Sequence, residues 1–193
     1  MTDLALPDPR TLLTECRIAP MSADDGPRLR TFCLAMIKEA FGFDYRPDWH
    51  ADLDAMCEGE HDYDSDRRGA FLVARRQGVI VGCGALKRLE ARPELAARFG
   101  DRYAEPDRIG SIWRVYIDPD HRCHGLGAEL SARLEALAAG LGYDRLYLHT
   151  SANARRSVAF WEGCGYEPFL AEEGPDEVTL HLDKNVGPLE LDG

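Results

Sequence analysis

The sequence predicts an α/β or α+β domain built on one central mixed sheet flanked by helices. Apolar runs of strand length recur along the chain, and segments with helical periodicity lie between them. The length of 193 residues fits one ordinary domain with a core that needs no disulfides. The composition, 45% hydrophobic and 30% charged, is typical of a globular protein and excludes a disordered or fibrous chain.

The first elements follow from apolar spacing. We expect residues 1–13 to form a loose leader and residues 14–186 to form the domain, with a first strand at 15–19. Residues 187–193 are expected to be a tail. An amphipathic helix is predicted from Pro27 onward, because its apolar residues recur at helical spacing until a glycine is available to end it.

Residues 47–66 are strongly acidic, with eight Asp or Glu and no Lys or Arg. We expect a short helix followed by a loop. The alternating acids at its end resemble a calcium loop, but Arg67 and Val73 stand where that motif needs Gly and Glu, so calcium is rejected. Two interpretations stay open: a lid that attracts a cationic amine, and a solvated acidic surface.

The middle of the chain reads as a hairpin, an insertion and a further strand. Apolar runs at 71–74 and 79–86, separated by Arg-Arg-Gln-Gly, predict an antiparallel hairpin. The polar insertion at 88–107 contains a short helical piece. A strand is predicted at 109–117, and a long helix with a leucine stripe follows at 126–141.

The last third alternates strand and helix. We expect a strand at 145–149, a helix with Val158 and Trp161 on one face, and strands at 166–170 and 178–182. Together with the hairpin, these elements complete the predicted sheet.

Composition excludes several classes of function. The net charge of -11 opposes binding to phosphate backbones, so neither nucleic acid nor an anionic membrane surface is an expected partner. The six cysteines form no Cys-x-x-Cys pair, so we expect reduced thiols and no metal. No apolar run approaches the ~20 residues needed to span a bilayer, and no signal pattern is visible at the start. A cytoplasmic location is expected.

The segment from Val115 to Ala128 is predicted to carry the chemistry. A strand ends there, turns at a proline and enters the long helix through Gly125 and Gly127. Amides of a first helical turn lack partners and favour an anion, and glycine lets a phosphate approach the backbone. Arg122 adds a cation with a planar fork. The Walker and dinucleotide motifs do not fit this segment, the latter because Leu130 stands where Gly or Ala is needed.

Two motifs resemble one family. Arg122-x-x-Gly125-x-Gly127-Ala128, after a strand ending in Asp-Pro, resembles the signature of the GNAT superfamily of N-acetyltransferases. The run Ala159-Phe-Trp-Glu-Gly-Cys-Gly-Tyr166 is similar to the second motif of that family, and the resemblance covers residues 70–184.

The resemblance implies a splayed mixed sheet, with the pantetheine of CoA between the fourth and fifth strands. It implies that backbone groups of Val115 and Ile117 bond the pantetheine and that Asn153 lies near a CoA-contacting position. It assigns the pyrophosphate to amides of the loop and helix start, namely Arg122, Cys123, His124, Gly125, Leu126, Gly127 and Ala128. Acetyl-CoA is the implied cosubstrate, without a metal.

The catalytic residues depart from the family pattern. Family members often place a Glu on the fourth strand as base and a Tyr on the later helix as acid, but Ser111 and Trp161 stand at these positions here. Tyr116 and His149 are the candidate substitutes, each weighed against a packing role. Glu90 and the acids of 48–66 are further alternatives.

The resemblance predicts an acetyl-CoA-dependent N-acetyltransferase that acts on the primary amine of a small molecule by direct transfer in a ternary complex. Alternatives stay open: a CoA-binding module without turnover, an acetyltransferase of protein amino groups, and a phosphate-binding protein unrelated to CoA. The acceptor is not identified by the sequence, and a homodimer is left open.

Overall fold

The structure is a computed structural model that describes residues 9–187, except for residues 60, 92, 100 and 175–176. The start of the expected leader, residues 1–8, and most of the expected tail, residues 188–193, lie outside the described residues. Residues 9–13 of the expected leader belong to helix α1 (Pro9–Thr14), and Leu12 is buried. Burial of the Leu12 side chain removes apolar surface from water and so stabilises this helical segment.

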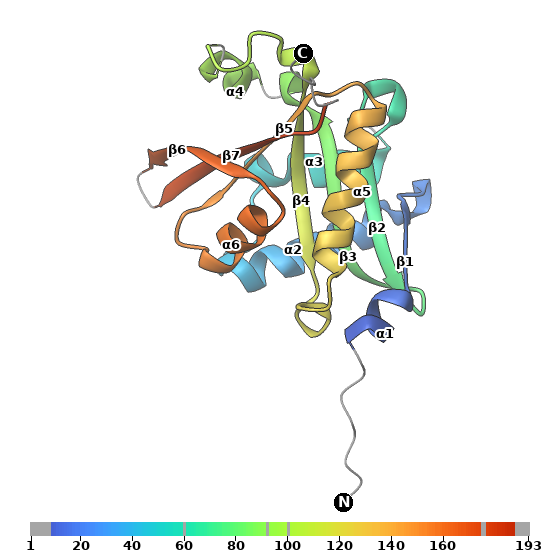
Figure 1. Cartoon of the computed structure of the whole chain (residues 1–193). Coiled ribbons are helices and arrows are strands. Elements are labelled where there is room, and N and C mark those ends of the chain that lie inside the picture. Colours follow the sequence, from blue (N-terminus) through green and yellow to red (C-terminus); the bar gives the residue numbers. More distant parts are fainter. Residues whose placement is uncertain (1–8, 60, 92, 100, 175–176, 188–193) are drawn as a thin grey trace, which may run out of the picture. The chain divides into compact units, whose positions relative to one another are not determined.

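A single mixed sheet of seven strands organises the chain, in the order β1-β2-β3-β4-β5-β7-β6 (Figure 1). The strands are β1 (Cys16–Pro20), β2 (Ala70–Arg76), β3 (Val79–Arg88), β4 (Ile109–Ile117), β5 (Arg145–Ser151), β6 (Glu167–Glu173) and β7 (Val178–Asn185). The sheet is mixed because β4 pairs with β5 in parallel, whereas β1 with β2, β5 with β7 and β6 with β7 are antiparallel. The predicted fold class is confirmed.

The helices also lie where periodicity placed them. They are α2 (Gly26–Phe41), α3 (Pro47–Glu58), α4 (Pro93–Arg98), α5 (Leu126–Gly140) and α6 (Arg155–Gly163). The predicted stripe of this helix consists of Leu126, Leu130, Leu134, Leu137 and Leu141. Leu137 is 38% exposed, whereas Ala138 is buried. The buried positions advance by four from Leu126, so the residue one turn after Leu134 is Ala138. None of the helices in the described part of the chain is long and apolar enough to cross a bilayer.

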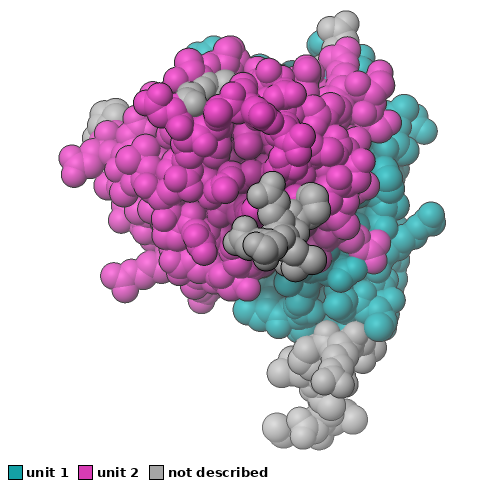
Figure 2. Space-filling model, turned by 45° about the horizontal axis from the view of Figure 1, so that its top comes forward, with its two compact units in different colours: residues 1–61, 70–85, 114–130 teal, residues 62–69, 86–113, 131–193 magenta. Residues whose placement is uncertain are grey.

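The chain divides into two compact units (Figure 2). The first unit comprises residues 1–61, 70–85 and 114–130, and the second comprises residues 62–69, 86–113 and 131–193. Each unit therefore holds part of β3, β4 and α5.

In the first unit, a turn at Ser22 and Asp25 starts α2. The backbone amide and the hydroxyl of Ser22 both donate to Asp25 Oδ2, at 2.7 and 2.6 Å, and Arg75 forms an ion pair with the same carboxylate. The helix ends at Gly42, whose φ of 75° is left-handed and favours glycine. Its buried face is formed by Leu29, Cys33, Met36 and Ile37.

The carboxylate of Asp25 is expected to make stability depend on pH. Burial raises the pKa of Asp25, but hydrogen bonds from Arg75 and Ser22 outweigh it and lower the pKa to about 2. Because the unfolded pKa is about 3.9, Asp25 stabilises the fold above that pH and loses this effect as the pH falls toward about 2. We expect Asp25→Asn to lower the free energy of unfolding by about 2 kcal/mol at pH 7, and by less at pH 3.

Urea unfolding at the two pH values measures this difference. The exposed neighbour Asp24 provides the control, because Asp24→Asn should change stability by no more than about 0.5 kcal/mol at either pH. Equal effects of the two substitutions at pH 7 would contradict the role of Asp25.

In the second unit, the insertion at 88–107 supplies much of a hydrophobic core. The buried members are Leu89, Leu95, Phe99, Tyr103, Ile109 and Tyr147, with Phe169 packed against them. Polar groups close one side of this core: the buried carboxylate of Asp183 accepts hydrogen bonds from Arg102, Tyr103 and Arg145. The insertion expected to be polar therefore has an apolar face that covers the sheet.

Candidate functional site

The loop between β4 and α5, in the first unit, is built by a proline turn and two left-handed residues. Asp118 accepts a hydrogen bond from the Asp120 amide at 3.1 Å and lies 2.9 Å from His121 Nδ1, which fixes the turn after β4. Cys123 and Gly125 then take φ values of 64° and 82°. These left-handed positions turn the chain into α5, and Gly125 takes its position without steric cost.

The amides at the start of α5 have no partner within the described chain. The first helical bond of α5 runs from the Glu129 amide to the Gly125 carbonyl at 3.0 Å, and the amides of residues 123–128 donate to no described residue. The Arg122 amide differs, because it donates to the Pro119 carbonyl at 3.4 Å. A row of unpaired amides at a helix N-terminus, with the helix dipole behind it, is an anion site.

His124 adds a second sign of a missing ligand in this loop. Its Nδ1 atom is buried and has no hydrogen-bond partner in the described structure. Leaving a buried polar atom unpaired costs about 1–3 kcal/mol, and such atoms are rare in folded proteins. The unpaired amides and this nitrogen together fit a ligand with phosphate oxygens.

Arg122 has a different set of partners from the one expected. Its guanidinium forms a bidentate pair with Glu39 of α2, at 2.6 and 3.0 Å, and its Nε donates to the Ile117 carbonyl at 2.9 Å. The hydrogen bonds to Glu39 raise the pKa of Arg122, against an opposing effect of burial. The side chain thus joins the end of β4 to α2, and its phosphate contact stays a prediction.

Arg114 has an unusual backbone conformation within β4. Its φ of 48° is left-handed, which is unusual for a non-glycine residue within a strand and typical of a β-bulge. The side chain forms a bidentate pair with Asp52 of α3, at 2.7 and 3.0 Å, and also donates to the Trp49 carbonyl at 2.8 Å. The Arg114 carbonyl accepts from the Cys83 thiol at 3.2 Å. Burial lowers the pKa of Arg114, but the hydrogen bonds to Asp52 outweigh it, so the pKa lies above its ordinary value.

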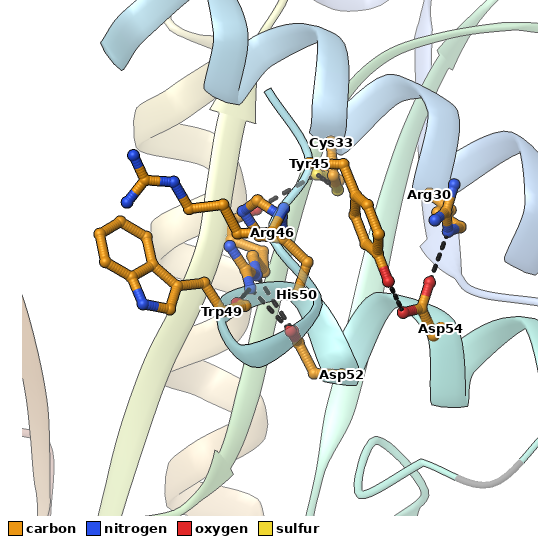
Figure 3. A network of polar contacts seen from close by, with 10 residues as sticks. Arg30, Cys33, Tyr45, Arg46, Trp49, His50, Asp52 and Asp54 are labelled. Carbon is orange, nitrogen blue, oxygen red and sulfur yellow. Dashed lines mark hydrogen bonds and ion pairs between the residues drawn. The ribbon is translucent and has the colours of Figure 1, made fainter. Parts of the chain in front are cut away.

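The acidic segment is partly neutralised by arginines from elsewhere in the chain. Asp52 pairs with Arg114, and Asp54 accepts from Arg30 at 2.7 Å and from Tyr45 at 2.6 Å. Figure 3 shows Arg30 and Tyr45 meeting at the carboxylate of Asp54. The absence of Lys and Arg in the segment therefore does not leave these two carboxylates unbalanced. A lid role for the rest stays a prediction.

Tyr116, one of the two catalytic candidates, lies on the same stretch of β4 as Val115 and Ile117. Burial raises the pKa of Tyr116 to about 12, against the opposing effect of Arg114. The phenol is therefore protonated at neutral pH and has a proton to donate, but it is not an effective base.

The two residues at the positions where the family resemblance expects a base and an acid are both buried in the second unit. Ser111 is buried, and its hydroxyl accepts from the Trp113 indole at 2.8 Å. Trp161 is buried against Tyr166, with ring centroids 5.2 Å apart. Neither position supplies a titratable group at neutral pH.

His149 and Asn153 also belong to the second unit. His149 is exposed on β5, its Nδ1 lies 3.3 Å from the Tyr147 hydroxyl, and its ring meets Trp113 edge to face at 5.8 Å. Asn153 is exposed in the turn after β5, where its amide donates to the Ser151 hydroxyl at 3.4 Å. No cluster of three or more metal-ligating side chains occurs among residues that the structure describes.

The family model of the Acetyltransferase (GNAT) family matches residues 34–166. The chain belongs to the GNAT family of acetyltransferases. It is 31% identical over 117 residues to an IAA acetyltransferase of Azospirillum brasilense, covering 59% of this chain and 66% of that protein. It is 28% identical over 150 residues to a mycothiol acetyltransferase of Saccharomonospora viridis, covering 74% of this chain and 46% of that protein.

Solved structures of acetyltransferases have the same fold. A GNAT-family acetyltransferase from Staphylococcus aureus superposes with a TM-score of 0.69 at 17% identity, covering 89% of this chain and 99% of that chain. A PaiA N-acetyltransferase from Thermoplasma acidophilum, solved with coenzyme A, has a TM-score of 0.66 at 14% identity, covering 88% and 98% of the two chains. The sequence resemblance to the GNAT superfamily is confirmed.

Proposed function

We propose that this GNAT chain is an acetyl-CoA-dependent N-acetyltransferase that acetylates the primary amine of a small molecule by direct transfer in a ternary complex. The observation that carries the proposal is the row of unpaired amides at residues 123–128. They match what a diphosphate needs, and the buried unpaired Nδ1 of His124 adds a polar group to the same loop. The coenzyme A complex of the T. acidophilum relative in fold supports this choice of ligand.

The pantetheine arm is proposed to lie along the end of β4. The register pairs β4 with β5 at Ile109, Gly110 and Ser111, whereas β4 continues to Ile117. Val115 and Ile117 lie in this continuation, as the family resemblance requires for residues that bond pantetheine. The left-handed residue Arg114 comes directly before them in the strand.

Acetyl-CoA would supply an activated acetyl thioester, and the chain would supply position and polarity. The amine nitrogen attacks the acetyl carbonyl, the C–S bond breaks, and the thiolate takes up a proton while the nitrogen loses one. A backbone amide of β4 is proposed to polarise the carbonyl, and the protonated phenol of Tyr116 is the proposed donor to the thiolate. Holding both reactants in place contributes up to about 7–11 kcal/mol.

The acceptor is proposed to be a small molecule because the curated relatives are named for small substrates: IAA, mycothiol and amino acids. One structural neighbour from Brucella melitensis, at 20% identity and a TM-score of 0.67, is named a ribosomal-protein-alanine N-acetyltransferase. A peptide with a free amino terminus therefore belongs in the substrate screen. The net charge of -11 favours a cationic acceptor.

Thermal unfolding with acetyl-CoA, CoA and ATP, followed by thiol release with a panel of amines, tests the proposal. We expect acetyl-CoA and CoA to raise the midpoint more than ATP does, and at least one small amine to release thiol. Strong stabilisation by CoA without thiol release would favour a binding module. Stronger stabilisation by ATP would favour a phosphate-binding protein unrelated to CoA.

Glu39 is expected to weaken CoA binding because its carboxylate pairs with Arg122 and neutralises this cation next to the proposed phosphate site. We expect Glu39→Gln to tighten CoA binding by up to about fivefold, which corresponds to about 1 kcal/mol for an exposed pair. Isothermal titration with CoA measures the change. Glu15→Gln is the matched control, because Glu15 forms a similarly exposed pair with Arg76 on β2. Equal affinities for the two variants would argue against a phosphate beside Arg122.

A further inference from the structure

Arg46 lies in an aromatic corner that Phe43 and Trp49 form in the first unit. Its Cζ atom is 5.0 Å from the ring centroid of Phe43 and 4.4 Å from that of Trp49. The two rings meet edge to face, with centroids 5.4 Å apart and planes at 86°. Figure 3 shows the Arg46 guanidinium beside the Trp49 ring, pointing away from Asp54. Arginine stacks on aromatic faces, and the N–H donors in its plane stay available for a ligand.

The backbone of Arg46 is also fixed. Arg46 is the N-cap residue of α3, and its carbonyl accepts from the amides of Trp49 and His50 at 3.1 and 3.0 Å. Its own amide donates to Nδ1 of the buried His50 ring at 2.9 Å. A side chain that is held in place before a ligand arrives loses less freedom on binding, and this favours affinity.

The guanidinium of Arg46 has no hydrogen-bond acceptor among the residues that the structure describes, and its side chain is exposed. Three acids near it in sequence pair with other cations instead. The pairs are Lys38 with Asp44, Arg114 with Asp52 and Arg30 with Asp54, each at 2.7 Å. Arg46 is thus a fixed cation whose donors are open to solvent, which suits bidentate recognition of an anion.

Exposed aromatic surface adjoins this cation. Trp49 is 56% exposed, and Phe41, which is 47% exposed, stacks on Phe43 with centroids 5.8 Å apart. The rings of Phe41, Phe43 and Trp49 therefore form a contiguous aromatic surface that reaches Arg46. Contiguous exposed apolar surface marks binding sites. A ligand that fits has an anionic head for Arg46 and an apolar portion for the rings.

The charge favours a carboxylate over a phosphate ester as the head group. Both anions match the fork of arginine, but a phosphate monoester carries about −1.5 to −2 charges at neutral pH. One guanidinium balances one carboxylate. The excess charge of a phosphate would stay uncompensated close to Asp48, an exposed acid of α3 that follows Arg46 by two residues.

Arg114 joins the aromatic corner to the part of β4, in the same unit, on which the proposed reaction depends. The Trp49 carbonyl accepts from the Arg114 guanidinium at 2.8 Å, and Arg114 precedes Tyr116 by two residues in β4. Burial raises the pKa of the Tyr116 phenol, and the Arg114 guanidinium opposes this effect. One guanidinium thus lies close both to Trp49 and to the proposed proton donor.

We propose that Arg46 and the aromatic corner bind an apolar α-amino acid, with the carboxylate held by two parallel N–H···O bonds from Arg46 and the side chain against the exposed rings. The inference rests on the proposed function, in which this amino acid is the acceptor. Its neutral amine forms the new C–N bond, the C–S bond of the thioester breaks, and the proton that the nitrogen loses balances the one that the thiolate gains. In solution the amine is cationic, which the net charge of -11 favours.

Phenylalanine and 2-phenylethylamine differ only in the carboxylate, so together they isolate the contribution of Arg46. We expect Arg46→Gln to lower kcat/KM for phenylalanine by about 10- to 100-fold, the usual scale of a charged hydrogen bond, and that for 2-phenylethylamine by less than about threefold. Arg28→Gln is the matched control, because Arg28 is an exposed arginine of α2 and its loss changes the net charge equally.

Two results of this comparison would overturn the proposal. One is an equal loss for both substrates in Arg46→Gln, because a merely structural role would act on both. The other is a loss for phenylalanine in Arg46→Gln no larger than that in Arg28→Gln. Arg46→Lys should fall between wild type and Arg46→Gln, since lysine keeps the charge without the planar fork.

Ligand binding decides the site independently of turnover. The probes are 3-phenylpropionate and phenyl phosphate, added to nitrogen-15 labelled protein with and without CoA while the Nε resonance of Arg46 is followed. We expect a saturable shift with 3-phenylpropionate and weaker binding of phenyl phosphate. No shift at Arg46, or tighter binding of phenyl phosphate, would overturn the inference even if amines are acetylated. Binding of 3-phenylpropionate at Arg46 without acetylation of any amine would support the site and contradict the proposed function.

Discussion

Replacing Gly125 with leucine is expected to abolish the stabilisation of the protein by acetyl-CoA. A ligand at 100 times its Kd stabilises a protein by about 2.7 kcal/mol, and this increment should vanish in the variant. The leucine side chain would stand among the unpaired amides of residues 123–128, where the phosphate is proposed to approach the backbone. Within the chain itself, a Cβ at Gly125 would meet its nearest neighbour, Leu13, at an ordinary 3.8 Å.

The variant has a backbone cost that needs its own control. Gly125 has a φ of 82°, so any side chain there is strained by about 1–2 kcal/mol. Gly78 has the same φ of 82° in the turn between β2 and β3, and a Cβ added there would have no described atom within 4 Å beyond its chain neighbours. Gly78→Leu should therefore lose similar stability in the free protein and keep the full response to acetyl-CoA. A normal response by Gly125→Leu would refute the placement of the diphosphate.

Asp52→Asn is expected to destabilise the protein by about 3 kcal/mol, the lower end of the cost of breaking a buried ion pair. The Arg114 side chain is 10% exposed and that of Asp52 is 21% exposed, so the substitution leaves a largely buried guanidinium without its counterion. Because Arg114 is the left-handed residue of β4, its backbone conformation should also become less well fixed, and turnover should fall.

The neighbouring carboxylate on α3 gives a matched comparison. Asp54 pairs with Arg30, and both side chains are about one third exposed, at 35% and 33%. Asp54→Asn should therefore cost no more than about 1 kcal/mol. Urea unfolding of both variants measures the difference in the free energy of unfolding. Losses of equal size would show that the pair of Arg114 with Asp52 contributes no more to stability than the pair of Arg30 with Asp54.

Most of the fold was predictable because it depends on local periodicity. The strand Ile109–Ile117 and the helix that begins at Leu126 lie where apolar spacing and the Asp-Pro and glycine signals put them. The hairpin turn was predictable from the Gln-Gly pair between two apolar runs. In the structure, Gln77 and Gly78 have φ values of 51° and 82°, which suit a two-residue turn. The exposed Leu137 was missed because a spacing of three from Leu134 looks as apolar in sequence as the spacing of four that the buried face follows.

The unpaired amides of the loop between β4 and α5 were predictable, but the partners of its neighbours were not. Unpaired amides follow from a glycine-containing entry to a helix, which is a local feature. Arg122 pairs with Glu39 and Arg114 pairs with Asp52, and these partners lie 83 and 62 residues away in sequence. Spacing rules concern residues close together in sequence. The sequence therefore could not show that both arginines form ion pairs with these carboxylates.

The most direct test of the account is a titration of the nitrogen-15 labelled protein with CoA, followed through the backbone amide resonances. We expect the largest shifts at residues 123–128, since their amides lack partners in the described part of the free chain, and little change at the Arg122 amide, which is bonded to Pro119. CoA binding that leaves the resonances of residues 123–128 in place would contradict the proposed site.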